Sequence, residues 1–306
     1  MDTIDGMRTF AAVAGEGSFS RAAERLDMSP QLASKYVALL EDRLGVRLLN
    51  RTTRRLSLTE AGRAYFDRVR QVLADIDEME HAVGDLTGRA RGILRINAPM
   101  SFGQHHLTPA IAEYQTAQPE VEVELTLNDR FVDIVSEGFD VAIRIGKLEE
   151  SSLVARRLAP VELAVCGAPE YFRRRGVPET PEDLAGHDCL RYAYAPDFYR
   201  WRFERGGRTH NVRINGTFSS NNGDALRAAA VAGKGIIFQP RFIVDEEIRA
   251  GRLETVLDDY HGETLYIHAV YAHRQYLSAK VRTFVDFLAG YLGTPPWDCA
   301  GDKSQR

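Results

Sequence analysis

Apolar residues recur every three or four positions at the start of the chain, which is the spacing of one face of a helix. They are Ile4, Met7, Phe10, Ala11 and Ala14. The pattern stops at Gly15 and Gly17. It therefore predicts a first helix of about 12 residues.

Two further helices follow with clear start signals. The second helix has an apolar face made of Phe19, Ala22, Ala23 and Leu26. Ser18 stands where it can cap this helix, and Ser29 followed by Pro30 opens the third one. Only Asp27 and Met28 lie between them. Two short helices joined by a few residues predict a helix-turn-helix.

The third helix has two contrasting sides on a helical wheel. Its core side is predicted to hold Ala33, Val37, Leu40 and Leu44. The opposite side holds Gln31, Ser34, Lys35, Ala38 and Asp42, and its N-terminal half carries no acidic residue. One interpretation is a solvated helix face. The other is a face that enters the major groove of DNA, because Gln can pair with adenine, Lys with guanine, and Ser with a base or a phosphate. The ring of Pro30 could then touch a thymine methyl group.

Residues 43–58 form a cationic segment without Asp or Glu. Its arginines are Arg43, Arg47, Arg51, Arg54 and Arg55. The sequence NRTTRR at 50–55 lies between two apolar stretches, which predicts a short hairpin. Arginine side chains and the hydroxyls of Thr52 and Thr53 suit phosphate oxygens, which take much of a protein's contact with DNA. The hairpin is therefore a candidate wing beside the third helix.

A long helix is predicted from Thr59 and Glu60 onwards. Its apolar residues are spaced alternately four and three apart, which is a heptad seam. The seam consists of Tyr65, Val69, Val72, Ile76, Met79, Val83 and Leu86. Charged residues lie off the seam, so the helix needs a partner, and a second copy of the chain is the simplest one. The alternative is that the stripe packs on the remainder of the same chain.

After residue 92 the pattern changes to alternating strands and helices, which favours an α/β sheet. Strands are predicted at 93–99, 121–127, 139–146, 161–167, 235–240 and 264–271. Helices are predicted around Leu107, Ile111 and Tyr114, at 131–138, from Thr180, at 223–233, and around Val281, Phe284, Val285 and Leu288. A hairpin at 201–214 should turn at Gly206 and Gly207, and the tail at 295–306 is predicted to be disordered.

The sequence GSFSRAAERLDMSPQLASKYVALLEDRLGVRLLNRTTRRLSLTEAG, residues 17–62, resembles the N-terminal domain of LysR-type transcriptional regulators. The resemblance begins at residue 2 and continues without a gap to the end of this segment. Later segments resemble the effector-binding domain of the same family. They are GILRINAPMSFG, EGFDVAIRIG, SSLVARRLAP and AGKGIIFQP.

The resemblance implies a multidomain architecture. An N-terminal, all-α winged helix-turn-helix would occupy residues 1–59, and a long linker helix for dimerisation would occupy 60–88. A bilobal α/β effector domain like a periplasmic binding protein would occupy 89–294. Its subdomain I would comprise about 91–160 and 265–294, and its subdomain II about 161–264. The implied partners are double-stranded DNA, a small-molecule effector held between the subdomains, and further copies of the chain in a homodimer or homotetramer.

The wheel, the wing and the resemblance together give a set of expected DNA contacts. These are Ser18, Ser29, Pro30, Gln31, Ser34, Lys35, Tyr36, Arg51, Thr52, Thr53, Arg54 and Arg55. Two positions depart from the family pattern: Ala33 stands where Val is commoner, and Tyr36 where Gln or Ala is commoner. The operator sequence therefore cannot be borrowed from a relative.

A second set of candidates concerns the effector. It consists of Ser101, Phe102, Asn128, Arg144, Phe198, Asn221, Asn222 and Gln239. Helix N-termini at Ser101 and Asn222 could seat a carboxylate, or these two residues could simply cap their helices. Arg144 could be another ligand of an anion, or an ion-pair partner of Asp140 or Asp133. Asn128, Phe198 and Gln239 are chosen because their loops should face the same cleft.

The composition of the chain restricts the possible functions but does not identify one. The 306 residues are 44% hydrophobic and carry a formal net charge of −4, so any basic surface must be local. Neither a signal peptide nor a membrane-spanning run is evident, which favours the cytoplasm and no membrane partner. Cys166, Cys189 and Cys299 lack the spacing of a disulfide framework or a zinc site, and we expect them to be buried apolar residues.

Catalytic and cofactor chemistry has no signature in the sequence. His105 and His106 are adjacent, so on a helix they point about 100° apart, and no carboxylate cluster supports a metal site. The motifs of nucleophilic, zinc and dinucleotide sites are missing. We therefore expect no cofactor, no metal and no enzymatic activity. The main hypothesis is a ligand-responsive transcription factor, and the alternative is an enzyme or transport-type receptor built on the bilobal domain.

Overall fold

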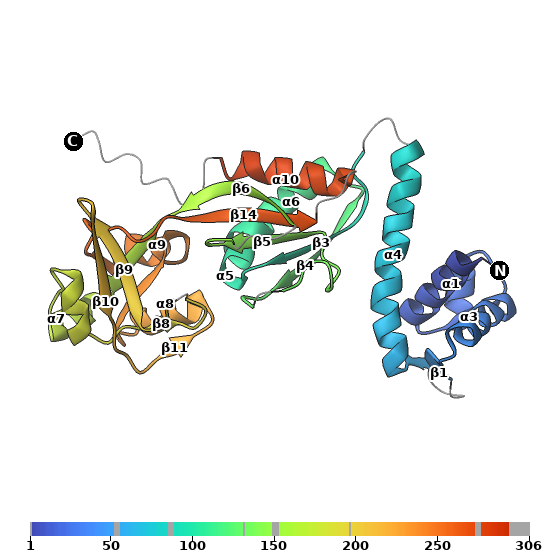
Figure 1. Cartoon of the computed structure of the whole chain (residues 1–306), viewed down its shortest axis with the longest axis horizontal. Coiled ribbons are helices and arrows are strands. Elements are labelled where there is room, and N and C mark those ends of the chain that lie inside the picture. Colours follow the sequence, from blue (N-terminus) through green and yellow to red (C-terminus); the bar gives the residue numbers. More distant parts are fainter. Residues whose placement is uncertain are drawn as a thin grey trace. The chain divides into compact units, whose positions relative to one another are not determined.

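A computed structural model describes residues 2–51, 56–84, 89–130, 132–148, 153–195, 197–272 and 277–293. The chain divides into two compact units, residues 1–89 and 90–306 (Figure 1). No helix in the described ranges has the length and apolar character needed to cross a membrane.

The first unit is a small helical domain with a two-stranded hairpin. Its elements are α1 (Thr3–Glu16), α2 (Phe19–Arg25), α3 (Pro30–Leu44), β1 (Leu49–Arg51), β2 (Leu56–Leu58) and α4 (Glu60–Gly84). Asp2, Ser18 and Ser29 each accept a backbone N–H at the start of the helix that follows. The helix-turn-helix, the helix starts at Ser18 and Ser29, and the antiparallel hairpin are confirmed.

The predicted core side of α3 is correct except at its last residue. Ala33, Val37 and Leu40 are at most 1% exposed, whereas Leu44 is 40% exposed. The helix ends at Leu44, and Gly45 follows in a left-handed conformation with φ 66°. The backbone therefore turns away at this point, and Leu44 extends past the packed part of the helix.

The long helix α4 begins at Glu60, directly after Thr59, as the sequence predicts. The Thr59 hydroxyl accepts the Gly62 N–H at 2.9 Å and donates to the carbonyl of Arg47 at 2.7 Å. A side chain at Gly62 would overlap the carbonyl oxygen of Leu48, so this glycine lets α4 lie directly on the hairpin.

Part of the predicted heptad seam is buried within a single chain. The ring centroid of Tyr65 lies 5.6 Å from that of Phe10 in α1, and Val69 is only 2% exposed. These two residues therefore do not offer a free surface to a second copy, which corrects the expectation of one continuous seam. Val72 is 42% exposed and Ile76 is half-buried. The side chains of Met79 and Val83 and the whole of Leu86 lie outside the described residues.

The second unit contains a mixed five-stranded sheet in the order β4-β3-β5-β14-β6. Its strands are β3 (Gly92–Ala98), β4 (Val121–Leu127), β5 (Val141–Ile145), β6 (Leu153–Val161) and β14 (Leu265–Ala272). Strand β3 is parallel to β4 and β5, whereas β14 is antiparallel to β5 and β6. Its helices are α5 (Met100–Phe102), the π-helical turn η1 (Gly103–Leu107), α6 (Thr108–Ala117) and α10 (Ala279–Tyr291), which lies along β6 and β14 (Figure 1). We call this sheet and its helices subdomain I.

A three-stranded sheet in the order β12-β7-β13 organises the rest of the unit, which we call subdomain II. Its sheet strands are β7 (Leu163–Gly167), β12 (Ile236–Pro240) and β13 (Glu254–Val256). Two strand pairs accompany them: β8 (Arg191–Tyr192) with β11 (Ser219–Ser220), and β9 (Arg200–Arg205) with β10 (Arg208–Arg213). The helices are α7 (Pro169–Arg175), the 3₁₀ helix η2 (Pro181–Gly186), α8 (Gly223–Val231) and α9 (Arg241–Arg249).

The α/β fold class is confirmed, but one predicted helix is wrong and several elements were not predicted. Residues 132–138 form turns, because the Asp133 carboxylate accepts the N–H groups of Val135 and Ser136 instead of leaving them to a helix. Strand β6 and helices α7 and α9 were not predicted from the residue pattern.

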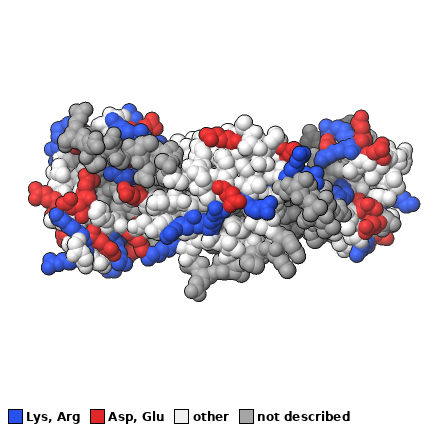
Figure 2. Space-filling model, turned by 90° about the horizontal axis from the view of Figure 1, so that it is seen from above, with Lys and Arg blue, Asp and Glu red and all other residues white. Residues whose placement is uncertain are grey.

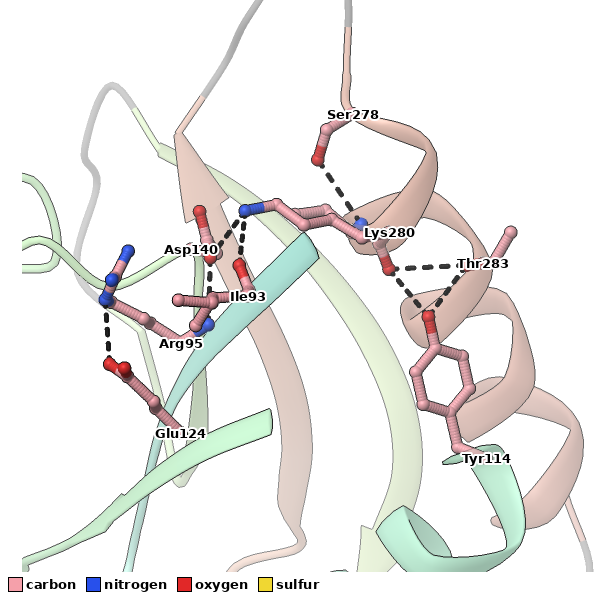
Figure 3. Close-up of polar contacts among 9 residues, drawn as sticks. Ile93, Arg95, Tyr114, Glu124, Asp140, Ser278, Lys280 and Thr283 are labelled. Atoms are coloured by element: carbon pink, nitrogen blue, oxygen red, sulfur yellow. Dashed lines mark hydrogen bonds and ion pairs between the residues drawn. The ribbon is translucent and has the colours of Figure 1, made fainter. Parts of the chain in front are cut away.

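A buried ion pair fastens α10 to the sheet (Figure 3). Lys280 Nζ donates to the Ile93 carbonyl at 2.6 Å and lies 3.1 Å from Asp140 Oδ2. The same carboxylate oxygen accepts the Arg95 N–H at 2.8 Å. Lys280 is only 8% exposed. One lysine therefore joins the start of α10 to β3 and to the residue that precedes β5.

Surface charge does not by itself mark a binding face. On the side of the molecule that Figure 2 presents, acidic and basic residues intermingle at the β9–β10 end, and a band of Lys and Arg crosses a largely uncharged middle. This mixture agrees with a net charge of −4. Anion-binding groups must therefore be located residue by residue.

Candidate functional site

Helix α3 presents part of the predicted DNA-contacting set to solvent. Gln31 and Lys35 are exposed, and neither side chain forms a hydrogen bond or ion pair within the described part of the chain. Pro30 is exposed at the first helical position, whereas Ser34 and Tyr36 are half-buried. The first turn carries no acidic residue. The N-terminal half of α3 is therefore free to meet a negatively charged groove.

Two of the predicted contacts already have structural roles. Ser18 Oγ accepts the Arg21 N–H at 3.5 Å, and Ser29 Oγ accepts the Leu32 N–H at 3.2 Å. The side chains of Ser18 and Ser29 are therefore helix caps, and each hydroxyl can still donate its own hydrogen to a phosphate oxygen.

The hairpin is held against α3 by a single carboxylate. Glu41 Oε1 accepts the N–H groups of Leu48 at 2.8 Å and Leu49 at 3.0 Å. These bonds fix the start of β1 relative to the third helix. The predicted wing residues Thr52, Thr53, Arg54 and Arg55 and the side chain of Arg51 lie outside the described residues.

A second candidate site is a cleft of about 840 Å³ lined by residues of both subdomains. Six predicted effector-binding residues line it: Ser101, Phe102, Asn128, Arg144, Phe198 and Gln239. Asn221 and Asn222 are not among its lining residues. Asn222 instead caps α8, because its Oδ1 accepts the Ala225 N–H at 2.9 Å. For Asn222, the capping alternative is therefore correct.

Ser101 of subdomain I and Gln239 of subdomain II both line the cleft and are buried, with exposed fractions of 5% and 4%. Gly223 at the start of α8 lies between them, since a Cβ there would be 3.1 Å from Gln239 Oε1 and 3.5 Å from Ser101 Oγ. Ser101 lies inside α5 and does not cap it. A Cβ at position 223 would also lie 2.5 Å from Ile243 Cδ1, so a larger residue there would crowd this part of the cleft wall.

Arg144 is a half-buried cation in subdomain I. Its Nη1 donates to Asn97 Oδ1 at 2.7 Å and to the carbonyl of Ile143 at 3.1 Å. Burial lowers the pKa of Arg144, although an arginine stays charged at neutral pH. Asp140, one of its two predicted ion-pair partners, binds Lys280 instead. The side chain thus keeps its charge at the cleft wall.

Arg191 is a cleft residue that the sequence analysis missed. Its guanidinium carbon lies 4.4 Å from the ring centroid of Phe198 and 5.2 Å from that of Tyr199. It forms no ion pair with any acidic residue among those described. A lone arginine in a two-residue strand carries no sequence signal, so only the folded arrangement shows that it reaches the cleft.

Acidic and amide groups of subdomain I lie in the wall of the same cleft. Asn128 and Asp129 follow β4, and Asp129 Oδ1 accepts the Met100 N–H at 3.1 Å. Burial raises the pKa of Asp129, while this hydrogen bond and the nearby Asn222 amide partly offset the increase. Burial also raises the pKa of Tyr192, with Asp129 adding to the effect.

The two adjacent histidines connect the subdomains rather than forming a metal site. His105 Nε2 lies 3.3 Å from Asp224 Oδ1, and His106 Nε2 lies 3.1 Å from the Phe242 carbonyl oxygen. Burial lowers the pKa of His106. Within the described ranges, no group of three or more His, Cys, Asp or Glu residues could hold a metal ion.

The cysteines Cys166 and Cys189 are buried, as predicted. Burial raises the pKa of both thiols to about 12, so both are unreactive.

Comparison with known proteins identifies the family. Residues 4–63 match the model of the bacterial regulatory helix-turn-helix protein, lysR family, and residues 87–293 match that of the LysR substrate binding domain. The chain belongs to the LysR family of transcriptional regulators. It is thus a DNA-binding regulator with an effector-binding domain, not an enzyme.

Relatives of this LysR regulator match it over nearly their whole length. An uncharacterized HTH-type transcriptional regulator of Haemophilus influenzae is 37% identical over 92% of this chain and 98% of its own. The regulator DmlR of Escherichia coli is 35% identical over 94% of each chain.

Two solved structures agree with the fold of this LysR regulator. CrgA of Neisseria meningitidis has a TM-score of 0.61 at 33% identity, and the match covers 94% of this chain and 98% of CrgA. Full-length AphB of Vibrio cholerae, a virulence activator, has a TM-score of 0.60 at 28% identity, covering 95% of this chain and 99% of AphB.

Proposed function

We propose that this LysR regulator binds specific DNA sequences through α3 and the hairpin, and that an anionic small molecule in the cleft controls this binding. The observation that carries the DNA-binding part is the exposed, acid-free start of α3, where Gln31 and Lys35 have no partner among the described residues. The hairpin sequence adds cationic residues beside it. Base edges would be read by α3, and phosphates would be held by the hairpin.

The anionic character of the effector is supported by charge in the cleft. Arg144 is half-buried in one wall, and Arg191 in the other wall has no acidic partner among the described residues. A carboxylate that accepted hydrogen bonds from either group would form a charge-assisted interaction away from bulk water. Binding between two subdomains would change the angle between them, and in an oligomer this changes the spacing of the DNA-binding domains.

Domain limits, assembly and location form part of the same proposal. Residues 1–59 would bind DNA, 60–88 would link and dimerise, and 89–294 would sense the effector. Exposed Val72 and half-buried Ile76 are the described seam residues still available for a homodimer, and a homotetramer would use further contacts of the regulatory domain. The cytoplasm is the proposed location, because a regulator must reach its DNA.

The decisive experiment is a gel-shift assay with DNA that flanks the protein's own coding sequence, at low and high salt. We expect retardation at low salt that weakens as salt rises, and tighter binding than to random DNA of equal length. Absence of retardation at every salt concentration would overturn the proposal.

A further inference from the structure

The residues that line the cleft include buried polar atoms that accept or donate no hydrogen bond. Among them are Asn128 Oδ1 and Asp129 Oδ2 in subdomain I, and Arg191 Nε in subdomain II. A buried polar atom without a partner costs free energy, so such atoms in a ligand cleft indicate what the ligand must supply. The first two oxygens need a donor, and the arginine nitrogen needs an acceptor.

The groups that need a donor are rigidly held. The Asn128 N–H donates to the Ala98 carbonyl at 3.0 Å, and Asp129 Oδ1 accepts the Met100 N–H at 3.1 Å. Both residues are therefore tied to the end of β3 and the start of α5. An ionised carboxylate can only accept hydrogen bonds, so a donor on the ligand would suit Asp129 Oδ2 in addition to the nearby Asn222 amide.

The group that needs an acceptor is held equally firmly. The Arg191 N–H donates to the Phe218 carbonyl at 3.1 Å, and the guanidinium lies over the ring of Phe198 at 4.4 Å. Aromatic faces attract the cation without neutralising it as a carboxylate would. Arg191 thus presents a full positive charge from subdomain II.

Aromatic side chains surround these polar groups. Phe102, Tyr192, Phe198, Trp201, Phe238 and Phe242 all line the cleft. A small inorganic anion would leave this apolar surface without contacts, whereas an organic acid with a ring or an alkyl chain would cover it.

We propose that the effector is an organic carboxylate with a hydroxyl or amino group beside the acid, whose carboxylate binds Arg191 while its donor binds Asn128 and Asp129. This inference rests on the proposed function and specifies the effector of that site. Because the two sets of groups belong to different subdomains, such a ligand bridges the cleft and draws the walls together. A plain acid lacking the donor can pair with Arg191 but leaves Asn128 Oδ1 and Asp129 Oδ2 without a donor.

Calorimetric titration of the full-length protein with two matched pairs of acids tests this inference. The pairs are phenylacetate with mandelate, and phenylpropionate with phenyllactate, which differ within each pair by one hydroxyl. We expect the hydroxy acid of at least one pair to bind about tenfold more tightly than its plain partner, as one well-made hydrogen bond to a buried acceptor allows. Hydrogen exchange should show protection of both β8 and residues 128–130 by the hydroxy acid, and of β8 alone by the plain acid.

Three variants locate the effect. Asp129→Asn keeps an acceptor for Met100 but can place an N–H donor where Oδ2 stood, so the preference for the hydroxy acid should fall to about one. Asn128→Ala should reduce the preference in the same direction. Arg191→Gln should weaken both acids at least tenfold and leave their ratio unchanged. Arg208→Gln, which changes an exposed arginine in β10, is the matched control and should alter neither affinity.

The outcomes separate this inference from the proposed function. If plain and hydroxy acids bind with equal affinity and Arg191→Gln weakens both, the proposal of a ligand that bridges the two subdomains is wrong. The proposal of an anionic effector would still hold. Failure of all four acids to bind at millimolar concentration would overturn both the bridging ligand and the anionic effector, whereas DNA binding is decided separately by the gel-shift assay. A preference that survives Asp129→Asn and Asn128→Ala unchanged would overturn the assigned donor site. The comparison of acids on the unaltered protein does not depend on how well any variant folds.

Discussion

The Glu41 carboxylate accepts the N–H of Leu48 at 2.8 Å, so the third helix and the first strand of the hairpin are joined through one side chain. The same oxygen accepts the Leu49 N–H at 3.0 Å. Since hydrogen bonds to a charged group are stronger than neutral ones, this residue should set the angle between the two proposed DNA contacts.

Replacing Glu41 should loosen this angle as well as the fold. Glu41→Ala is expected to lower the free energy of unfolding of the first unit by about 1.5–3 kcal/mol, the usual value of hydrogen bonds to a charged partner, and to weaken DNA binding. Chemical denaturation and gel shifts measure the two effects. Glu41→Gln keeps an acceptor of the same shape and should lose less of both. An Ala variant with unaltered stability and affinity would show that the hairpin is positioned by other contacts.

The exposed Gln31 should affect sequence preference more than affinity for DNA in general. Gln31→Ala removes an amide that can pair with adenine, so binding to the operator should weaken by about 1–3 kcal/mol while binding to random DNA stays nearly constant. Competition gel shifts with both DNAs provide the ratio. Gln104→Ala changes an exposed glutamine of the second unit and should leave this ratio intact. Equal losses on both DNAs would argue against base reading by Gln31.

Arg54 of the hairpin lies outside the described residues, and its predicted role as a phosphate contact can be tested by salt dependence. Arg54→Ala should weaken binding to all DNA sequences and reduce the slope of log affinity against log salt by about one. Arg173→Ala in α7 removes the same charge from the second unit and should not change the slope. An Arg54 variant with the original slope would remove this arginine from the DNA interface.

The first unit was the most predictable part of the fold, because its signals are local. Ser29 and Pro30 act within one turn of the helix that they begin, and each does what its position predicts. Leu44 shows the limit of this approach, since the wheel assigns it to the core but cannot show that the packed region ends one turn earlier. Tyr65 and Val69 show a second limit, because a heptad pattern does not reveal which surface covers it.

The cleft was predictable only in part. Ser101 is predicted because it stands near a helix start, and Gln239 because its loop should face the cleft. The structure places Gln239 in strand β12 rather than in a loop. Arg191 and Asp129 were missed, because what marks them is a buried polar atom without a hydrogen-bond partner, and this depends on residues far away in the sequence. The segment 131–138 is predicted as a helix, but the Asp133 side chain takes the N–H groups of Val135 and Ser136 that such a helix would use. Competition between side chain and backbone is invisible to a periodicity argument.

The described part of the seam gives a direct test of dimerisation. Ile76→Asp places a charge on the surface proposed to meet a second α4, so the protein should sediment as a monomer. Arg68→Asp alters an exposed residue off the seam and should leave the assembly unchanged. An Ile76 variant with the original sedimentation coefficient would assign the stripe to packing within the chain.

Lys280 and Asp140 form a buried ion pair (Figure 3). Removing either partner alone should lower the free energy of unfolding, because the remaining charge would stay buried without compensation. Lys280→Met leaves the Asp140 carboxylate buried with only the Arg95 N–H beside it among the contacts described. The expected loss is about 3–5 kcal/mol, or a melting temperature lower by on the order of 10 °C for the second unit. Calorimetry should show the transition of the first unit unaltered.

Two further variants serve as controls. Adding Asp140→Asn to Lys280→Met removes the uncompensated charge and should recover most of the lost stability. Arg156→Met breaks the exposed pair with Asp286 and should lower the free energy of unfolding by less than about 1 kcal/mol. If Lys280→Met and Arg156→Met cost the same, burial would not be what makes the Lys280 contact important.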